Sequence, residues 1–160
     1  MSGAELPAAV LGLLAGTPEA GAWEPVFPLV TTDPDGGPRV CLLSSAELEA
    51  DPDRVRCAVR SRRTTANLRR GGAALLQVVE GATSWSVRTR VGRTAQDGHG
   101  GFAAELLVTA VEPDSLGIPL RPMTFLADAA LAALERWDDN AVLFARLTGP
   151  DDRAGEETRA

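Results

Sequence analysis

Lysine and tyrosine are both absent from this 160-residue sequence, and all 16 of its basic side chains are arginine. Without lysine, the chain cannot form a Schiff base with pyridoxal phosphate or supply the lysine of a phosphate loop or a kinase ion pair. A tyrosine–lysine dehydrogenase pair is excluded as well. One histidine, His99, and two cysteines, Cys41 and Cys57, are too few for a tetrahedral zinc site, so we expect no metal. A bound phosphate or carboxylate must therefore be held by arginine, hydroxyl or backbone N–H groups.

Aromatic residues are also scarce, at 4% of the chain, although 44% of the residues are hydrophobic and 24% are charged. These values are typical of a globular protein whose core is built from Leu, Val and Ala. The length fits a single domain, which we place at residues 1–148, followed by a flexible polar tail at 149–160. Because such a core is small, an oligomer interface has room to bury further apolar surface.

No segment approaches the roughly 20 apolar residues that a membrane-spanning helix requires. The apolar run at 8–14 lacks the preceding positive charge of a signal peptide, since the first basic residue is Arg39. Two cysteines without an evident partner fit a reducing compartment. The sequence therefore predicts a soluble cytoplasmic protein that does not bind a membrane.

Positive charge is concentrated in the middle of an acidic chain. Ten of the 16 arginines lie between Arg54 and Arg93, where Glu80 is the only acid, while the whole chain carries a net charge of −6. This asymmetry favours a localised anion site over a surface that coats a polyanion. Nucleic-acid binders usually combine a basic stripe with a high pI, whereas this sequence has a pI near 4.8. We therefore expect no nucleic-acid partner.

Short apolar segments separated by turn residues predict a mainly β protein, a barrel of about six antiparallel strands decorated by short helices. The Asp/Pro/Gly cluster at 33–38 predicts a hairpin turn between the first two strands. The expected strands are residues 26–32, 39–44, 55–59, 73–79, 84–90 and 102–111, with a further short strand at 141–147. The expected helices are residues 5–14, 45–50, 61–70 and 124–137.

The segment from 60 to 70 carries the most chemistry, because it lies where a strand passes into a helix. A helix start offers unpaired backbone N–H groups and the positive end of the helix dipole. Ser61 and Thr64 add hydroxyls, and Arg62 and Arg63 add guanidinium donors. These groups form a candidate phosphate cradle without lysine. The alternative is an exposed, capped helix whose arginines are solvated.

Residues 84–91 show the clearest alternation in the chain. Trp85, Val87, Thr89 and Val91 form one face of the predicted strand, and serine and arginine side chains form the other. Trp85 is therefore either a core residue or a contact for a ligand ring. Trp23 and Trp137 are interpreted as packing anchors, the two cysteines as small core residues, and His99 as a solvated residue of a glycine-rich turn.

Four motifs together resemble the pyridoxamine 5'-phosphate oxidase-like family of FMN-binding split barrels, over residues 27 to 113. Their order and spacing match the short members of that family. The motifs are Arg39-Val40-Cys41-Leu42-Leu43, Ser61-Arg62-Arg63, the run from Ala66 to Gly72 before a strand, and Val111-Glu112-Pro113-Asp114.

The resemblance implies a split β-barrel homodimer with two FMN sites at the subunit interface. The FMN phosphate would be held by Arg39, Ser61, Arg62, Arg63 and Thr64, the strand after Arg39 would lie along the flavin ring, and Trp85 would come from the partner or lie beside the ring. Arg63 stands where the oxidases have lysine, and their Trp- and Arg-rich C-terminal segment is missing. Pyridoxamine phosphate oxidase activity is accordingly not expected.

Two classes of function follow from this resemblance. The first is an FMN-dependent oxidoreductase of unknown substrate, in which no side chain acts as a catalytic acid or base. The second is a non-catalytic split-barrel module that binds flavin, deazaflavin or haem, or a dimeric protein without a cofactor. The sequence does not identify the substrate.

Overall fold

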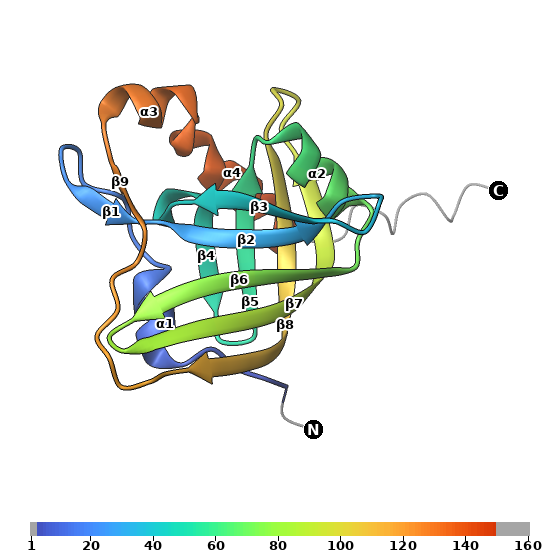
Figure 1. Ribbon diagram of the computed structural model, residues 1–160. Helices are drawn as coiled ribbons and strands as arrows, with labels where there is room; N and C mark the ends of the chain where they lie inside the picture. The colour runs from blue at the N-terminus through green and yellow to red at the C-terminus, as the bar shows by residue number, and fades with distance from the viewer. Residues whose placement is uncertain (1–2, 150–160) are drawn as a thin grey trace.

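The computed structural model describes residues 3–149, whose main element is one curled sheet of seven antiparallel strands (Figure 1). The strands are β2 (Phe27–Thr32), β3 (Pro38–Leu43), β4 (Leu48–Asp51), β5 (Arg54–Val59), β6 (Ala73–Glu80), β7 (Thr83–Gln96) and β8 (Phe102–Asp114). Their order in the sheet is β3-β2-β6-β7-β8-β5-β4, which leaves β3 and β4 at its edges. The predicted mainly β architecture is confirmed, with one strand more than the six expected.

The curl of the sheet originates in its two long central strands. β7 has 14 residues and β8 has 13, and their pairing shifts register between Arg88 and Thr89 and again between Val91 and Thr94. Such bulges bend a strand and increase its twist, which wraps the sheet around an enclosed core. At the predicted β2–β3 hairpin, Gly36 adopts a positive φ of 88°, a conformation that glycine reaches without steric cost.

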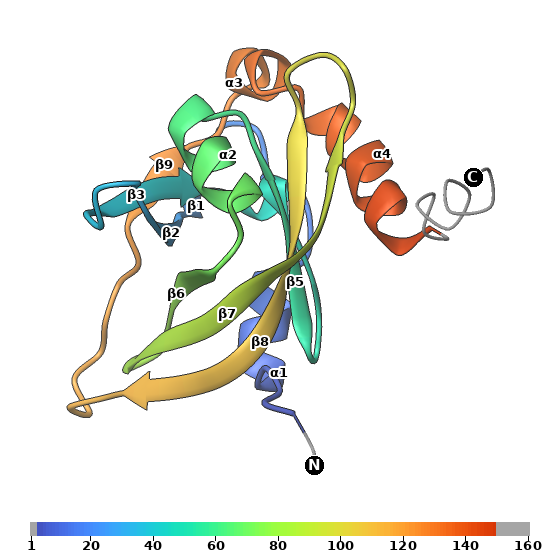
Figure 2. The ribbon, with the colours of Figure 1, turned by 90° about the vertical axis from the view of Figure 1, so that its right-hand side faces the viewer.

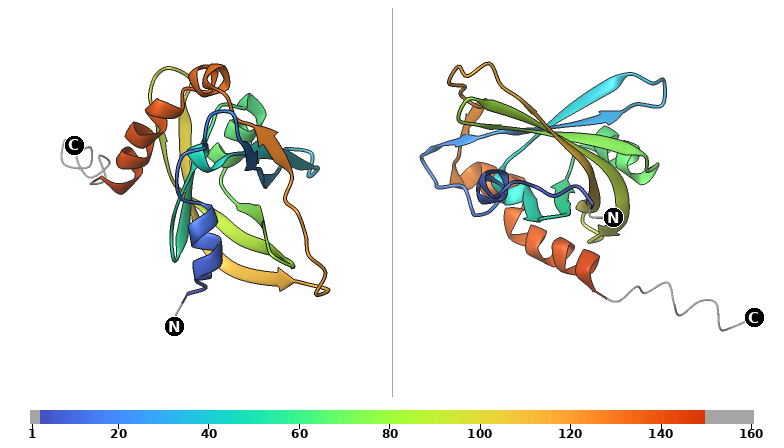
Figure 3. Two further views of the ribbon diagram at one scale, coloured as in Figure 1. Left: turned by 90° about the vertical axis from the view of Figure 1, so that its left-hand side faces the viewer. Right: turned by 90° about the horizontal axis from the view of Figure 1, so that it is seen from below.

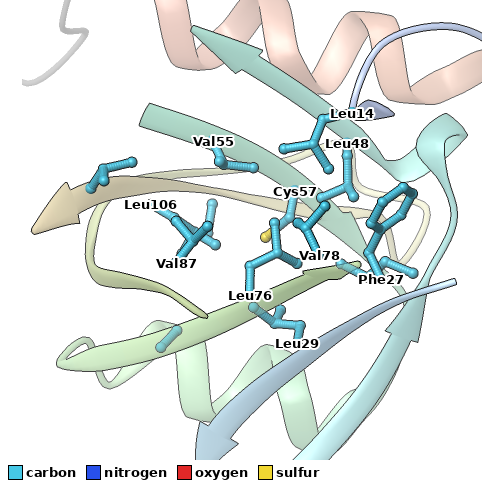
Figure 4. Packing of buried hydrophobic residues seen from close by; sticks show 14 of the residues in the cluster. Leu14, Phe27, Leu29, Leu48, Val55, Cys57, Leu76, Val78, Val87 and Leu106 are labelled. Carbon is cyan, nitrogen blue, oxygen red and sulfur yellow. The ribbon is translucent and has the colours of Figure 1, made fainter. Parts of the chain in front are cut away.

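The core lies inside the curl, where alternate residues of neighbouring strands meet. Leu29, Leu76, Val87 and Leu106 are all 0% exposed and belong to one cluster (Figure 4). On β6 every second side chain is buried, the period-2 pattern of a strand with one face on a core. Cys57 lies in the same cluster, so the prediction that it is a small core residue is confirmed.

Helices cover the barrel at separate places (Figures 2 and 3). The helix α1 (Ala8–Leu13) adds Val10 to the main core, with Leu14 just beyond its end. The helix α2 (Arg62–Arg69) follows β5, and α3 (Ala129–Leu134) and α4 (Trp137–Thr148) end the described chain. A second, two-stranded sheet pairs β1 (Trp23–Pro25) with β9 (Thr124–Leu126).

Three predicted elements differ from the structure. Residues 45–50, expected to be helical, form a single 3₁₀ turn, η1 (Ser45–Glu47), and then β4, because Leu48 packs into the core. The helix expected at 124–137 is shorter, because residues 124–126 pair with β1 and Asp128 caps α3 by accepting the Leu131 N–H at 2.6 Å.

The segment 141–147, expected to be a strand, lies within α4. There Leu143, Phe144 and Leu147 form a helical stripe buried against Ala58 and Ala103. A short apolar run fits either type of element by periodicity alone, and here packing against the outside of the barrel selects the helix.

Arg56 is buried on the face of β5 that points away from the main core. It is 4% exposed, and its Nη2 donates to Glu49 at 2.9 Å and to Asp51 at 2.7 Å, both on the neighbouring edge strand β4. Burial alone would lower the pKa of Arg56, but the two carboxylates hold it above its ordinary value. This arginine therefore ties β4 to the sheet.

Two further observations concern residues 3–149 as a whole. No helix among them combines the length and the apolar character needed to span a bilayer. They also contain no group of three or more His, Cys, Asp or Glu side chains arranged to hold a metal ion. Of the predicted tail at 149–160, residues 150–160 lie outside the described residues.

Candidate functional site

The start of α2 is capped by Ser61, which the sequence placed inside the predicted helix at 61–70. Ser61 has extended backbone geometry, its Oγ accepts the Thr64 N–H at 3.4 Å, and its carbonyl accepts the Thr65 N–H at 2.9 Å. Within the described chain, the N–H groups of Arg62 and Arg63 are left without a hydrogen-bond acceptor. The first turn carries no acidic residue, so its positive end is not neutralised from within the helix.

The ten arginines between residues 54 and 93 do not form one basic patch, because most of them are paired. Arg62, Arg63 and Arg90 are exposed, and the guanidinium groups of these three make no hydrogen bond or ion pair with another part of residues 3–149. The other seven donate hydrogen bonds to acidic, amide or carbonyl oxygens: Arg54, Arg56, Arg60, Arg69, Arg70, Arg88 and Arg93. The candidate anion site therefore narrows to Arg62 and Arg63 at the helix start.

A cavity of about 500 Å³, which we call the hairpin cavity, lies between the β2–β3 hairpin and α2. Arg39 donates to Asp33 twice, from Nε to Oδ1 and from Nη2 to Oδ2, both at 2.7 Å. Asn67 also donates to Asp33 Oδ1, at 2.9 Å, and thereby ties α2 to the hairpin. The lining residues are Asp33, Pro34, Asp35, Arg39, Arg63, Ala66, Asn67 and Arg70.

Asp33 gives the hairpin cavity a pH dependence. The hydrogen bonds from Arg39 and then from Asn67 lower the pKa of Asp33 from 3.8 to about 2. A lowered folded-state pKa stabilises the fold above about pH 4, and this contribution disappears as the pH falls through about 2. We expect Asp33→Asn to lose stability less steeply than the wild type between pH 4 and pH 2 in urea unfolding.

The matched control for that experiment is Asp35→Asn, which lies in the same turn but is paired with the Gly37 N–H and no guanidinium. This variant should reproduce the wild-type slope. If Asp33→Asn and the wild type lose stability in parallel over this range, the Arg39–Asp33 pair contributes nothing to acid sensitivity.

A second cavity, of about 510 Å³, lies beside the edge strand β3, and we call it the edge-strand cavity. Phe125 and Trp137 form part of its wall, their rings crossing at 85° with centroids 6.3 Å apart. Arg60, also in the wall, fixes the turn between α3 and α4 by donating to the carbonyls of Glu135 and Arg136. The lining residues are Val26, Cys41, Leu42, Leu43, Ser44, Glu47, Val59, Arg60, Ser61, Phe125, Leu131, Glu135 and Trp137.

Two titratable groups in that wall are shifted by burial. Burial raises the pKa of Glu47, and the negative charge of Glu135 raises it further. The Ser44 N–H, which donates to Glu47 Oε2 at 2.6 Å, acts in the opposite direction and lowers this pKa. Burial also raises the pKa of the Cys41 thiol, while the Thr64 hydroxyl lowers it. A thiol with a raised pKa is a poor nucleophile, which agrees with the interpretation of Cys41 as a packing residue.

The structure brings only part of the predicted site together. Arg39 and Arg63 line the hairpin cavity, and Ser61 lines the edge-strand cavity on the other side of the start of α2. Arg62 and Trp85 line neither cavity. Thr64 is 1% exposed, so its side chain faces the protein interior.

The aromatic predictions divide as well. Trp85 packs against the main core, while Trp23 is 68% exposed, so the prediction that Trp23 is a packing anchor is wrong. Trp137 packs against Phe125 but also lines a cavity. Sequence reasoning missed Asp33 as the partner of Arg39, because its position in an Asp/Pro/Gly turn already explained it. It also missed Glu47 in the cavity wall, for which the sequence gives no signal beyond a helix-capping pattern.

Comparisons with known proteins agree with this architecture. No protein-family model and no curated protein matches the sequence. An F420 reductase structure is 17% identical, covering 67% of this chain and 98% of its own, with a TM-score of 0.51. The HupZ structure from Group A Streptococcus is 10% identical, covering 72% and 99%, with a TM-score of 0.54.

A Clostridium acetobutylicum protein related to general stress protein 26, of the pyridoxinephosphate oxidase family, is 11% identical, covering 63% and 84%, with a TM-score of 0.48. The chain therefore has a split-barrel fold, like the F420 reductase and HupZ structures. At these identities the likeness establishes the fold alone. The two cavities of this split barrel therefore have to be interpreted from its own residues.

Proposed function

We propose that this split barrel binds FMN and functions as an oxidoreductase on a small molecule, with the flavin phosphate at the start of α2. The observation that carries the proposal is the pair of unpaired guanidinium groups, Arg62 and Arg63, on a capped helix start beside a cavity that follows β3. The likeness to an F420 reductase and to a pyridoxinephosphate oxidase-family protein motivates the choice of a flavin-type ligand.

The donor set fits a phosphate dianion. Two free backbone N–H groups, the positive end of the helix dipole and two arginines lie within the first turn, and each charge-assisted bond is about twice as strong as a neutral one. Ser61 accepts the N–H groups of Thr64 and Thr65, so the N–H groups earlier in the turn are the ones left for a ligand. Thr64 supports it from beneath, since its side chain is buried.

Arg39 has a more restricted role in this proposal. Its Nε and one N–H of Nη2 donate to Asp33, so Nη1 and the second N–H of Nη2 are left to reach an anion in the hairpin cavity. Asp33 would also repel a phosphate placed there. We therefore assign the main grip on the phosphate to Arg62 and Arg63, with Arg39 as a neighbouring positive charge.

The ring of the flavin would lie along β3, whose outer edge is not paired within the described sheet. Val40 and Leu42 on that strand are 59% and 51% exposed. Other apolar side chains elsewhere on the surface are 42–87% exposed: Leu116, Ile118, Leu120 and Met123. We propose that a second copy of the chain covers them in a homodimer, with Trp85 of one copy beside the ring or within its own core. A bound flavin supplies hydride or electron transfer, and the chain binds and shields it.

FMN and riboflavin differ only in the phosphate, so together they test the proposed grip. We expect Arg63→Ala to weaken FMN binding by about tenfold to a hundredfold, because one charge-assisted hydrogen bond contributes roughly 1.5–3 kcal/mol. Riboflavin affinity should stay unchanged. Quenching of flavin fluorescence on titration with the protein measures both.

Arg90→Ala is the matched control, because Arg90 is also exposed and unpaired but lies on β7. It should bind both flavins as the wild type does. A wild-type protein that binds neither flavin contradicts the function, and an equal loss of FMN and riboflavin in Arg63→Ala contradicts the phosphate assignment.

The second candidate is a non-catalytic split barrel that carries flavin, deazaflavin or haem. Oxidation of a reduced nicotinamide donor by the FMN-loaded protein separates the two. Multiple turnovers support the oxidoreductase, and their absence together with tight FMN binding supports the carrier.

A further inference from the structure

The start of α2 lies between the two cavities, because Ser61 lines the edge-strand cavity and Arg63 lines the hairpin cavity. A flavin whose ring follows β3 and whose phosphate binds at this helix start therefore has the hairpin cavity beyond its phosphate. That cavity, of about 500 Å³, is large enough to hold a further group attached to the phosphate. The charges in its wall decide whether such a group is accepted.

Asp33 is a fixed negative charge in the wall of the hairpin cavity. Its two carboxylate oxygens accept hydrogen bonds from the Nε and the Nη2 of Arg39, both at 2.7 Å, and Asn67 Nδ2 adds a third bond to Oδ1 at 2.9 Å. Asn67 is 5% exposed and also donates to the Thr31 hydroxyl at 3.0 Å, so it is held in place itself. These bonds lower the pKa of Asp33 to about 2, and the carboxylate is therefore ionised at neutral pH.

The other charges of the hairpin cavity cancel once Arg63 binds a phosphate. The charged lining residues are Arg39, Arg63, Arg70, Asp33 and Asp35. With Arg63 engaged, two arginines and two aspartates remain, so the rest of the wall carries no net charge. Arg70 is also partly used, since it donates to the Asn67 amide oxygen at 3.0 Å and to the Thr32 carbonyl. A second anionic group would therefore meet no net positive charge, and it would share the cavity with the Asp33 carboxylate.

We propose that Asp33 determines which flavin nucleotide this site accepts. As an internal anion paired with Arg39, it leaves room for one terminal phosphate at the start of α2 and keeps a second phosphate out of the hairpin cavity. FMN and FAD share the ring and the ribityl phosphate, and FAD continues through a second phosphate to adenosine. The chain therefore prefers FMN to FAD. The inference rests on the proposed function, since the first phosphate is the one assigned to Arg62 and Arg63.

Titration calorimetry with FMN and with FAD at neutral pH tests this discrimination. We expect the wild type to bind FMN at least tenfold more tightly than FAD. Asp33→Asn keeps an oxygen acceptor for Arg39 but removes the negative charge, so the preference should fall below threefold through a gain in FAD affinity. A wild type that binds FAD as tightly as FMN overturns the proposal, and so does an unchanged preference in Asp33→Asn whose circular dichroism shows it to be folded.

Asp53→Asn is the matched control, because Asp53 also accepts two hydrogen bonds from one arginine, Arg54, at 3.0 and 2.9 Å, and lines neither cavity. It removes the same charge and the same kind of ion pair, so it should keep the wild-type preference. Asp35→Asn removes a charge inside the hairpin cavity, from an exposed carboxylate that accepts the Gly37 N–H. Its effect should be smaller, because water screens an exposed charge. Equal effects of Asp35→Asn and Asp33→Asn contradict the specific role of Asp33.

Inorganic pyrophosphate tests the hairpin cavity without any flavin. The side-chain amide of Asn67 donates to Asp33, so its NMR resonances report on the cavity wall. We expect pyrophosphate to shift these resonances with a midpoint at least tenfold lower in Asp33→Asn than in the wild type, and equal midpoints overturn the inference. A wild type that binds no flavin but shows the pyrophosphate contrast contradicts the proposed function alone. One that binds FMN without discriminating against FAD contradicts this inference alone.

Discussion

Leu76→Ala should lower the free energy of unfolding by about 3–5 kcal/mol, the cost of removing a fully buried leucine and leaving a cavity. Leu76 is 0% exposed and lies on β6, opposite Leu29 on one neighbouring strand and Val87 on the other. Its side chain therefore packs between two neighbouring strands of the curled sheet, within the main core. Urea unfolding followed by circular dichroism measures the loss.

Leu134→Ala is the control for that measurement, since Leu134 is 75% exposed on α3. Its unfolding free energy should change by less than about 0.5 kcal/mol. If Leu76→Ala costs no more than this control, the interior of the barrel is not the close-packed core that the burial indicates.

The double variant Glu49→Gln with Asp51→Asn should lower the free energy of unfolding by about 3 kcal/mol. It leaves the guanidinium of Arg56, which is 4% exposed, without a carboxylate partner, and a buried unpaired charge is strongly destabilising. Removing the positive charge of Arg56 instead, with both carboxylates kept, is expected to cost less. The two carboxylates are about half exposed, so water can solvate them. Equilibrium unfolding of both variants at neutral pH compares the two costs.

Arg56→Met is the variant that completes this comparison, since methionine fills much of the same space without a charge. We expect it to be more stable than the double variant. If Arg56→Met is instead the less stable of the two, the packing and hydrogen bonds of Arg56 contribute more than the cost of its unpaired charge.

Local chemistry made much of the fold predictable. The Asp/Pro/Gly turn at 33–38, the helix that begins near residue 61 and the alternation around Val87 each depend on neighbouring residues, and the structure has each of them in the predicted place. Residues 141–147 of α4 form a short apolar run without a decisive period, so the sequence predicts a strand where the structure has a helix. Its identity follows from packing against Ala58 and Ala103, which lie more than 35 residues away in the sequence.

The candidate site shows the same division. The sequence singles out Ser61, Arg62 and Arg63 as candidates for an anion site, because a hydroxyl followed by two arginines at a strand-to-helix junction is a local pattern. It did not predict that Asp33 occupies Arg39, a pairing six residues apart through a hairpin turn, nor that Trp137 faces β3 across a cavity. These features depend on distances that exist only in the folded chain.

By itself, the sequence determined that only arginine, hydroxyl or backbone groups could hold an anion, because lysine and tyrosine are missing. It also determined a mainly β barrel and the helix start at residue 61. The tertiary structure decided which arginines are free, since pairs such as Arg54 with Glu105 join residues 51 positions apart. It further decided that Arg39 and Arg63 share one cavity with Asp33 while Ser61 and Glu47 line another, because the folded sheet rather than sequence order brings these residues together.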